Sequence, residues 1–170
     1  MIIVLNGPCG VGKSTVAKLI SEQLDHPIYI KGDDVLNMIV NSEIILEHVL
    51  LTERNLVRLV KNFTQGGYKN YIIDFVYEEQ YCLDRFVTEL KKFVRDVFVI
   101  RLFCDLEENV RRDRERDPED ICGRERVIEL NEVFSGVGDQ LGHAIDNTSL
   151  SPTETVELIM DFVKNPANIY

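Results

Sequence analysis

The 170-residue sequence has no tryptophan and only three histidines and four cysteines. The cysteines are far apart and form no C-x-x-C pair, which argues against a zinc site and against a disulfide framework. No apolar run approaches the roughly 18 residues of a membrane span. No internal repeat or proline-, glycine- or serine-rich linker divides the chain. Because a chain of this length can bury about 70% of its unfolded surface, we expect a single domain over residues 1–170.

Positive charge is also scarce, since 19 lysines and arginines face 29 acidic residues and the net charge is −10. Such a chain has no general electrostatic attraction to nucleic acid or to anionic membranes, so we expect neither as a partner. The first apolar segment begins at Met1, and we therefore expect no targeting segment and a cytoplasmic location. The arginines are unevenly placed, because seven of the eleven lie between Arg101 and Arg126. This asymmetry indicates a specific role for that segment.

One known sequence motif is present in full. Residues 7–14 read Gly-Pro-Cys-Gly-Val-Gly-Lys-Ser, the G-x-x-x-x-G-K-[ST] pattern of a phosphate-binding loop. An apolar run at residues 1–5 precedes it, and apolar residues at helical spacing follow over residues 14–24, as expected for a buried strand, a loop and a helix. Backbone N–H groups and the positive end of the helix dipole then converge on one point, which suits a polyphosphate. The sequence predicts that the protein binds a nucleoside triphosphate.

The motif assigns a role to each part of this loop. Lys13 can reach the β- and γ-phosphates, and the Ser14 hydroxyl can bind Mg²⁺. The glycines let the backbone approach the phosphates, which a Cβ atom would obstruct. We interpret Cys9 as a small residue at a variable position, although a helix N-terminus can lower a thiol pKa. The residues expected to bind the nucleotide here are Gly7, Gly10, Val11, Gly12, Lys13, Ser14 and Thr15.

Apolar runs and helical patterns alternate along the rest of the chain. Further strands are expected at 27–31, 71–75, 97–103 and 143–146, and helices at 45–65, 79–93, 106–116, 124–134 and 152–163. Ser151 and Glu154, with proline between them, form a capping box at the start of the last helix. The alternation predicts an α/β fold whose parallel sheet is covered by helices on both faces. Active sites in such sheets lie beyond the carboxyl ends of the strands.

Carboxylates stand at the ends of two expected strands. Asp74, at the end of the third strand, can hold Mg²⁺ opposite Ser14 as a Walker-B carboxylate does, or it can cap the following segment. Asp33 and Asp34 follow the second strand, and we expect one to face the crevice while the other caps a helix from Val35. We favour Asp33 as the general base and ligand of an acceptor hydroxyl, although the sequence leaves open which of the two serves.

The arginine-rich segment is the second strong signal. Arg112 and Arg116 lie four residues apart on one helical face, just before a proline and a glycine interrupt the chain. A flexible segment flanked by arginines can close over a triphosphate and neutralise charge that develops at the γ-phosphoryl group. We expect a lid at about 112–126 with Arg112 and Arg116 as its catalytic arginines. The alternative is a solvated helix in which these arginines pair with nearby acids.

These motifs resemble those of the small P-loop kinases, which include shikimate and gluconate kinases, chloramphenicol phosphotransferase and bacterial AAA-type ATP-binding kinases. The resemblance spans nearly the whole chain through GPCGVGKST, YIKGDDV, IIDFV and IDNTSLSP. It implies a three-layer P-loop NTPase fold, a five-stranded parallel sheet in the order 2-3-1-4-5, an ATP donor and Mg²⁺. It also implies that the loop around Asn147 and Thr148 packs against adenine, that Asp33 lies at the acceptor site, and that Arg112 and Arg116 are the lid arginines.

Two departures from these families leave the acceptor unassigned. Shikimate kinases carry a Gly-Gly-Gly run where this chain has Phe75-Val76-Tyr77, and the Cys-Ser-Ala-Leu-Lys segment of gluconate kinases is absent. We expect an ATP- and Mg²⁺-dependent phosphotransferase that acts on a hydroxyl of a small metabolite or antibiotic. A nucleoside or nucleotide kinase is the nearest alternative, with Arg54 and Arg58 as ligands of a second phosphate. A GTPase or regulatory module is less favoured, because no Asn-Lys-x-Asp guanine signature occurs.

Overall fold

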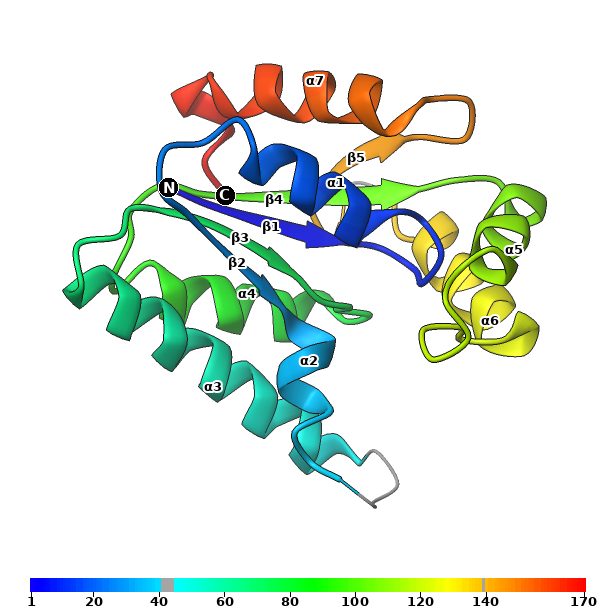
Figure 1. Cartoon of the computed structure of the whole chain (residues 1–170), viewed down its shortest axis with the longest axis horizontal. Helices are drawn as coiled ribbons and strands as arrows, with labels where there is room; N and C mark the ends of the chain where they lie inside the picture. Colours follow the sequence, from blue (N-terminus) through cyan, green and yellow to red (C-terminus); the bar gives the residue numbers. More distant parts are fainter. Residues whose placement is uncertain (41–44, 139) are drawn as a thin grey trace.

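A computed structural model describes residues 1–40, 45–138 and 140–170. Within these residues, one sheet of five parallel strands has the order β2-β3-β1-β4-β5 (Figure 1). The strands are β1 (Ile2–Asn6), β2 (Pro27–Lys31), β3 (Asn70–Asp74), β4 (Val97–Phe103) and β5 (His143–Asp146). The helices are α1 (Lys13–Ser21), α2 (Gly32–Leu36), α3 (Leu46–Gln65), α4 (Gln80–Leu90), α5 (Leu106–Arg114), α6 (Arg124–Gly136) and α7 (Pro152–Val163), followed by a short 3₁₀ turn, η1 (Pro166–Asn168). The predicted fold class and strand order are confirmed.

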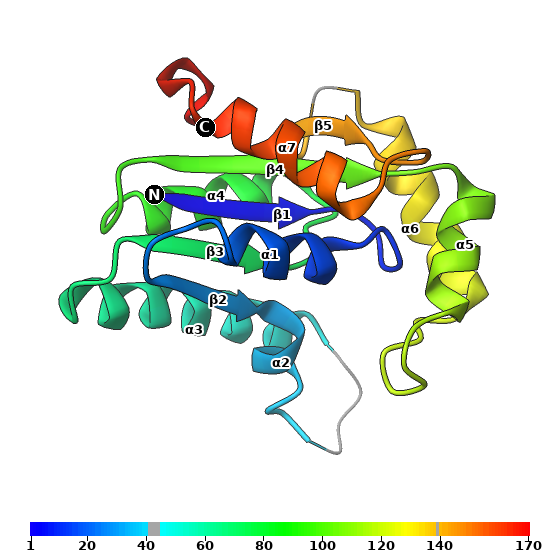
Figure 2. The ribbon, with the colours of Figure 1, turned by 45° about the horizontal axis from the view of Figure 1, so that its top comes forward.

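Helices cover both faces of the sheet and make it the middle of three layers. Figures 1 and 2 show α1 and α7 on one face and α3 and α4 on the other. Ile2 and Val4 of β1 belong to the core under α3, α4 and α6, whereas Ile3 and Leu5 belong to the core under α1 and α7. All four are fully buried. Burial on both faces explains why this strand is an unbroken apolar run rather than an alternating one.

The helix ends follow the sequence signals in most places. At the start of α7, Ser151 Oγ accepts a hydrogen bond from the Glu154 N–H (3.2 Å), and the Glu154 carboxylate accepts one from the Ser151 N–H (2.8 Å), so the predicted capping box is confirmed. α3 ends at Gln65 with Gly66 as its C-cap, as expected. α4 and α5 end at Leu90 and Arg114, a few residues earlier than their patterns predict.

One predicted helix start is wrong. The helix after β2 begins at Gly32 rather than at Val35, and its N-cap is Lys31 in an extended conformation. Neither Asp33 nor Asp34 is a cap, because both lie inside the first turn of α2. Carboxylates are also favourable there, since they face the positive end of the helix dipole.

The carboxyl ends of three strands lie together beside the phosphate-binding loop. In the register of the sheet, Asp74 of β3 pairs with Leu5 of β1 on one side and with Lys31 of β2 on the other. All strand arrows in Figure 1 point toward the end of the sheet where α5 and α6 lie. Among the described helices, none is both long and apolar enough to cross a bilayer.

Candidate active site

The loop between β1 and α1 curls around the Lys13 ammonium. Lys13 Nζ donates hydrogen bonds to the carbonyl oxygens of Gly7 and Pro8, each at 2.8 Å. Gly12 has φ 96° and directly precedes the first residue of α1. Gly7 has φ 135°, and a Cβ atom there would lie 2.2 Å from the Leu102 carbonyl oxygen. Glycine is therefore required at both positions, by backbone conformation at the first and by space as well at the second.

Asn6, at the end of β1, holds the start of this loop. Its Oδ1 accepts hydrogen bonds from the N–H groups of Gly7 and Tyr77, both at 2.9 Å. Its Nδ2 donates to the carbonyl oxygens of Tyr77 (3.1 Å) and Leu141 (3.3 Å). The side chain is fully buried, so these four backbone groups have no access to bulk water as a substitute partner. Asn6 joins β1, the chain after β3 and the chain before β5 at the base of the site.

We expect Asn6→Ala to lower the free energy of unfolding by about 3 kcal/mol, because it leaves several buried backbone groups without a hydrogen-bond partner. Urea denaturation of the two proteins measures this difference. The matched control is Asn62→Ala on the exposed face of α3, which we expect to change the stability by less than about 0.5 kcal/mol. Equal stabilities for Asn6→Ala and wild type would show that Asn6 does not anchor the loop.

Two further asparagines fasten the middle of the loop from distant elements. Asn109 of α5 donates from Nδ2 to the Cys9 carbonyl oxygen at 2.6 Å. Asn147, just after β5, donates from Nδ2 to the Val11 carbonyl oxygen at 2.9 Å. Both asparagines are buried. The conformation of the loop therefore depends on the segments that follow β4 and β5 as well as on its own glycines.

A hydroxyl and a carboxylate meet at the end of β3. Ser14 Oγ donates to Asp74 Oδ2 at 2.7 Å, and the Tyr29 hydroxyl donates to the same oxygen at 3.0 Å. Asp74 is 3% exposed, and burial raises its pKa, while the bonds from Ser14 and Tyr29 and the Lys13 charge oppose that rise. Such adjacent hard oxygen ligands suit Mg²⁺. The Ser14–Asp74 pair thus fits the metal that the motif implies.

Asp33 and Asp34 differ in their charged neighbours. Asp34 lies 3.5 Å from the Lys31 ammonium. Asp33 instead acts on the two charged groups at the loop: it raises the pKa of Lys13, which burial lowers, and it raises the pKa of Asp74. Of the two aspartates, Asp33 is thus the one whose charge acts on both Lys13 and Asp74.

Arg112 is held by the segment that follows β5. Its Nη2 donates to the carbonyl oxygens of Asn147 (2.9 Å) and Thr148 (3.2 Å), and its Nε donates to Glu108 at 2.7 Å. The guanidinium therefore supports the loop that the family resemblance assigns to adenine. This position favours a role in shaping the adenine side of the site.

Arg116 stands at the start of the segment that joins α5 to α6. Its Nη1 lies 3.4 Å from Asp113 Oδ1 and 3.5 Å from Cys122 Sγ. Asp113 is 2% exposed, and its two oxygens accept the N–H groups of Cys122 and Gly123, both at 3.1 Å. The end of the segment is thereby folded back onto α5. Residues 115–123 join α5 to α6 within the range 112–126 that the sequence predicts as a lid, and we refer to them as the lid segment.

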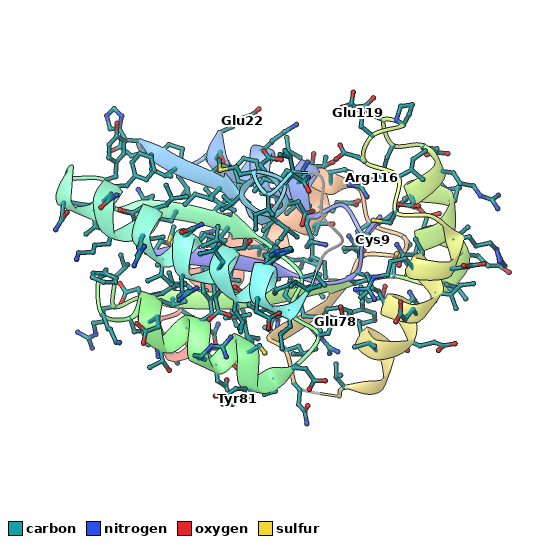
Figure 3. The ribbon with its side chains drawn as sticks, turned by 90° about the horizontal axis from the view of Figure 1, so that it is seen from below. Cys9, Glu22, Glu78, Tyr81, Arg116 and Glu119 are labelled. Carbon is teal, nitrogen blue, oxygen red and sulfur yellow. The ribbon has the colours of Figure 1, made fainter. Side chains whose placement is uncertain are left out.

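The lid segment reaches across the site toward β2. Its Asp120 carboxylate lies 3.1 Å from the ammonium of Lys31, the last residue of β2. Figure 3 shows Arg116 and Glu119 on this segment and Cys9 on the phosphate-binding loop beside it. The ion pair is partly exposed, so it contributes little stability and can open.

These elements line an open cavity of about 1300 Å³. Its lining includes most of the site residues expected from the sequence: Gly10, Val11, Gly12, Lys13, Ser14, Thr15, Asp33, Asp34, Asp74, Arg112, Arg116, Asn147 and Thr148. Gly7, the first residue of the loop, is buried and is not among the described residues that line the cavity. Arg54 and Arg58 are exposed on α3 and lie outside the cavity lining in the described residues.

Sequence reasoning missed the residues that hold the site together. Asn6 carried a detectable signal, because it is a polar residue that ends an apolar strand directly before the glycine loop. Tyr29 and Asn109 carried none, since their roles depend on which distant segment lies against them. The proximity of Cys9 and Cys122 was also missed, because residue separation along the chain says nothing about two loops that converge on one cavity.

A glycine loop between a parallel strand and a helix, with a lysine inside it and a serine–aspartate pair beside it, defines a P-loop nucleotide-binding domain. The AAA domain family matches residues 3–131, and the chain belongs to that family. The resemblance to the small P-loop kinases is confirmed at the level of family and fold. The comparison with curated proteins gives no significant match.

Several solved structures share the fold over nearly their whole lengths. The tunicamycin resistance protein of Deinococcus radiodurans has a TM-score of 0.73 at 21% identity, with 95% of this chain and 94% of that chain covered. A sugar kinase from Janibacter has a TM-score of 0.71 at 16% identity, covering 99% and 98%. A gluconokinase from Sinorhizobium meliloti has a TM-score of 0.68 at 16% identity, covering 95% and 90%.

Proposed function

We propose that the protein is an ATP- and Mg²⁺-dependent phosphotransferase that moves the γ-phosphoryl group to a hydroxyl of a small molecule. The proposal is carried by one observation: the Asp33 carboxylate, which makes no ion pair in the described part of the chain, and the lid arginine Arg116 both lie beside the phosphate-binding loop. Asp33, from the first turn of α2, and Arg116, from the lid segment, line the same cavity as Lys13. A regulatory nucleotide-binding module needs neither of the two, whereas transfer to a hydroxyl uses both.

The arrangement assigns a task to each group. Lys13 and the loop N–H groups would hold the phosphates, and Ser14 and Asp74 would hold the metal. Mg²⁺, held by these two residues, would supply charge neutralisation at the phosphates. Asp33 would accept the proton of the acceptor hydroxyl. Arg116 would stabilise charge at the transferred group.

The charges that line the cavity disfavour an acceptor that carries a phosphate. Two of its cations are each paired with two carboxylates: Lys31 with Asp34 and Asp120, and Arg126 with Glu78 and Glu129. A nucleotide acceptor would have to break these pairs, and Arg54 and Arg58 lie outside the cavity lining. A neutral or cationic polyol fits better. The similar structures described as a sugar kinase, a gluconokinase and a tunicamycin resistance protein support a small hydroxylated acceptor.

The direct test is a screen for acceptor-dependent ADP release from ATP and Mg²⁺. The panel contains neutral sugars, sugar acids, shikimate-like acids, nucleosides, nucleoside monophosphates, and aminoglycoside, phenicol and tunicamycin-type antibiotics. We expect stimulation by neutral or cationic hydroxyl compounds. Turnover confined to nucleoside monophosphates would favour the nucleotide kinase alternative instead. Release of ADP that no acceptor stimulates would contradict the proposal.

For the lid, we expect Arg116→Ala to lower kcat about tenfold while ATP affinity changes little, because the arginine acts mainly as the γ-phosphoryl group departs. The expected effect on kcat is moderate because the Arg116 guanidinium already contacts Asp113 and Cys122, so only part of its charge acts on the phosphoryl group. Steady-state kinetics give kcat, and a separate titration of ATP binding gives the ATP affinity. Arg114→Ala, on the exposed side of α5, is the matched control and should behave as wild type. An unchanged kcat in Arg116→Ala would leave this arginine as a purely structural residue.

A further inference from the structure

Two thiols that are far apart in the sequence line the same cavity. Cys9 lies in the phosphate-binding loop and is 8% exposed, whereas Cys122 lies in the lid segment and is exposed. Their sulfur atoms and an oxygen of Asp113 all lie within 4.8 Å of one another. In Figure 3, Cys9 lies on the side of the loop that faces the lid segment and Arg116.

The surroundings make Cys122 the reactive member of the pair. The neighbouring Cys9 thiol and the Arg116 guanidinium, whose Nη1 lies 3.5 Å from the Cys122 sulfur, lower the pKa of Cys122 to about 7. The neighbouring Cys122 thiol and burial raise the pKa of Cys9. A substantial part of Cys122 is therefore thiolate at neutral pH, and the thiolate is the form that reacts with oxidants. An exposed, low-pKa thiol beside a second cysteine is the arrangement of a redox-sensitive pair.

We propose that Cys9 and Cys122 form a reversible disulfide in the presence of a peroxide, and that this bond ties the lid segment to the phosphate-binding loop and blocks nucleotide binding. The pair is a covalent modification site, and the proposal does not require that the protein be a kinase. It uses only the nucleotide-binding loop and the segment that covers it.

The chemistry balances with hydrogen peroxide as the oxidant. The Cys122 thiolate attacks one peroxide oxygen, the O–O bond breaks, and a sulfenic acid and hydroxide form. The Cys9 sulfur then attacks the sulfenic sulfur, the S–O bond breaks, and water leaves with the thiol proton. The hydroxide takes up the proton that Cys122 lost on ionisation, so two thiols and one peroxide give one disulfide and two waters. A dithiol reductant reverses the bond by thiol–disulfide exchange.

The local backbone permits the closure. The lid segment is not helical, and the two sulfurs already lie within 4.8 Å of each other. Rotation of the two side chains can therefore bring them toward the bond length of about 2 Å, while Asp113 keeps its bonds to the backbone. A metal ion held by the same two sulfurs and Asp113 is disfavoured, since both Asp113 oxygens already accept N–H groups and Arg116 lies against one of them. The covalent bond needs none of these contacts to break.

The bond can be detected without any activity assay. Each cysteine falls on its own tryptic peptide: Cys9 on 1–13, Cys82 on 70–85, Cys104 on 102–111 and Cys122 on 117–124. The protein is treated with hydrogen peroxide in the presence of a chelator, blocked with N-ethylmaleimide, digested without reductant and analysed by mass spectrometry. We expect peptide 1–13 linked to peptide 117–124. The link should be absent in Cys122→Ser and retained in Cys82→Ser.

The consequence for the site is tested on the same samples with a fluorescent ATP analogue. We expect oxidation to weaken its binding at least about tenfold in wild type and in Cys82→Ser, and dithiothreitol to restore it. Cys122→Ser should bind equally well before and after peroxide. Because coupling is reciprocal, bound ATP should in turn disfavour the cross-link.

Peroxide oxidation without a 1–13 to 117–124 link would overturn the proposed pair, whatever happens to binding. A link that leaves nucleotide affinity unchanged would overturn the proposed block. Neither readout involves phosphoryl transfer, so a failure here is distinct from a failure of the proposed kinase activity.

Discussion

Lys13→Ala is expected to lower phosphoryl transfer by about 10²-fold or more, since one pre-placed charged donor contributes roughly 3 kcal/mol to stabilisation of such a transition state. In the folded protein the ammonium is held at the centre of the loop by the carbonyl oxygens of Gly7 and Pro8. Its charge is thus in position before a phosphate arrives and needs little rearrangement. The measurement is kcat/KM for ATP with the best acceptor from the screen.

The control for this substitution is Lys69→Ala at an exposed position, and both variants must show wild-type unfolding curves. We expect the control to keep full activity. A stably folded Lys13→Ala protein with activity within about tenfold of wild type would rule out the assigned role of the loop lysine, because a lost donor of this kind costs more than that.

Asp33→Asn is expected to slow transfer by roughly 10²–10⁴-fold with little change in ATP affinity, because a general base acts on the acceptor rather than on the donor. The substitution keeps the size of the side chain and removes its ability to accept a proton. Asp34→Asn is the matched comparison, since it changes the neighbouring residue whose carboxylate pairs with Lys31. We expect Asp34→Asn to retain most of the activity.

Measured together, these two variants decide between the roles left open by the sequence. If Asp34→Asn were the inactive one, the general base would be Asp34. If ATP affinity fell in parallel with the rate in Asp33→Asn, Asp33 would act on the metal or the phosphates, and the base would lie elsewhere.

The layered fold could be predicted because its signals are local and repeated. β1 is apolar at four consecutive buried positions, Ile2 to Leu5, as a strand covered on both faces requires. The capping box at Ser151 and the glycine at 66 are short-range signals as well, and both mark the helix ends observed. The order of the strands came from the family resemblance, since alternation alone does not specify how parallel strands are arranged.

The start of α2 shows why a local rule can fail. An aspartate pair after a strand suggests a cap followed by a helix. Here β2 passes directly into α2 at Gly32, where an added Cβ atom would lie 2.4 Å from the Phe75 ring. The tight junction is set by packing against the chain after β3, and the two aspartates are carried into the first turn of the helix.

The parts of the site that escaped prediction are the long-range contacts. Asn109 touches the loop only because α5 lies over it, and nothing in the charged sequence around Asn109 marks that contact. Cys9 and Cys122 likewise come together through the fold of the lid segment, which Asp113 holds in place. Motif spacing identifies groups that act on a ligand, whereas the groups that position them depend on the tertiary structure.

The central claim, that the γ-phosphoryl group of ATP passes to a hydroxyl acceptor, is tested most directly by phosphorus NMR. The protein, ATP, Mg²⁺ and an acceptor selected by the screen are observed together, with Lys13→Ala as the inactive comparison. The account predicts a new phosphate-monoester signal on the acceptor that grows in step with ADP, and no such signal with Lys13→Ala. Formation of ADP and inorganic phosphate alone, at a rate independent of every acceptor tried, would contradict it.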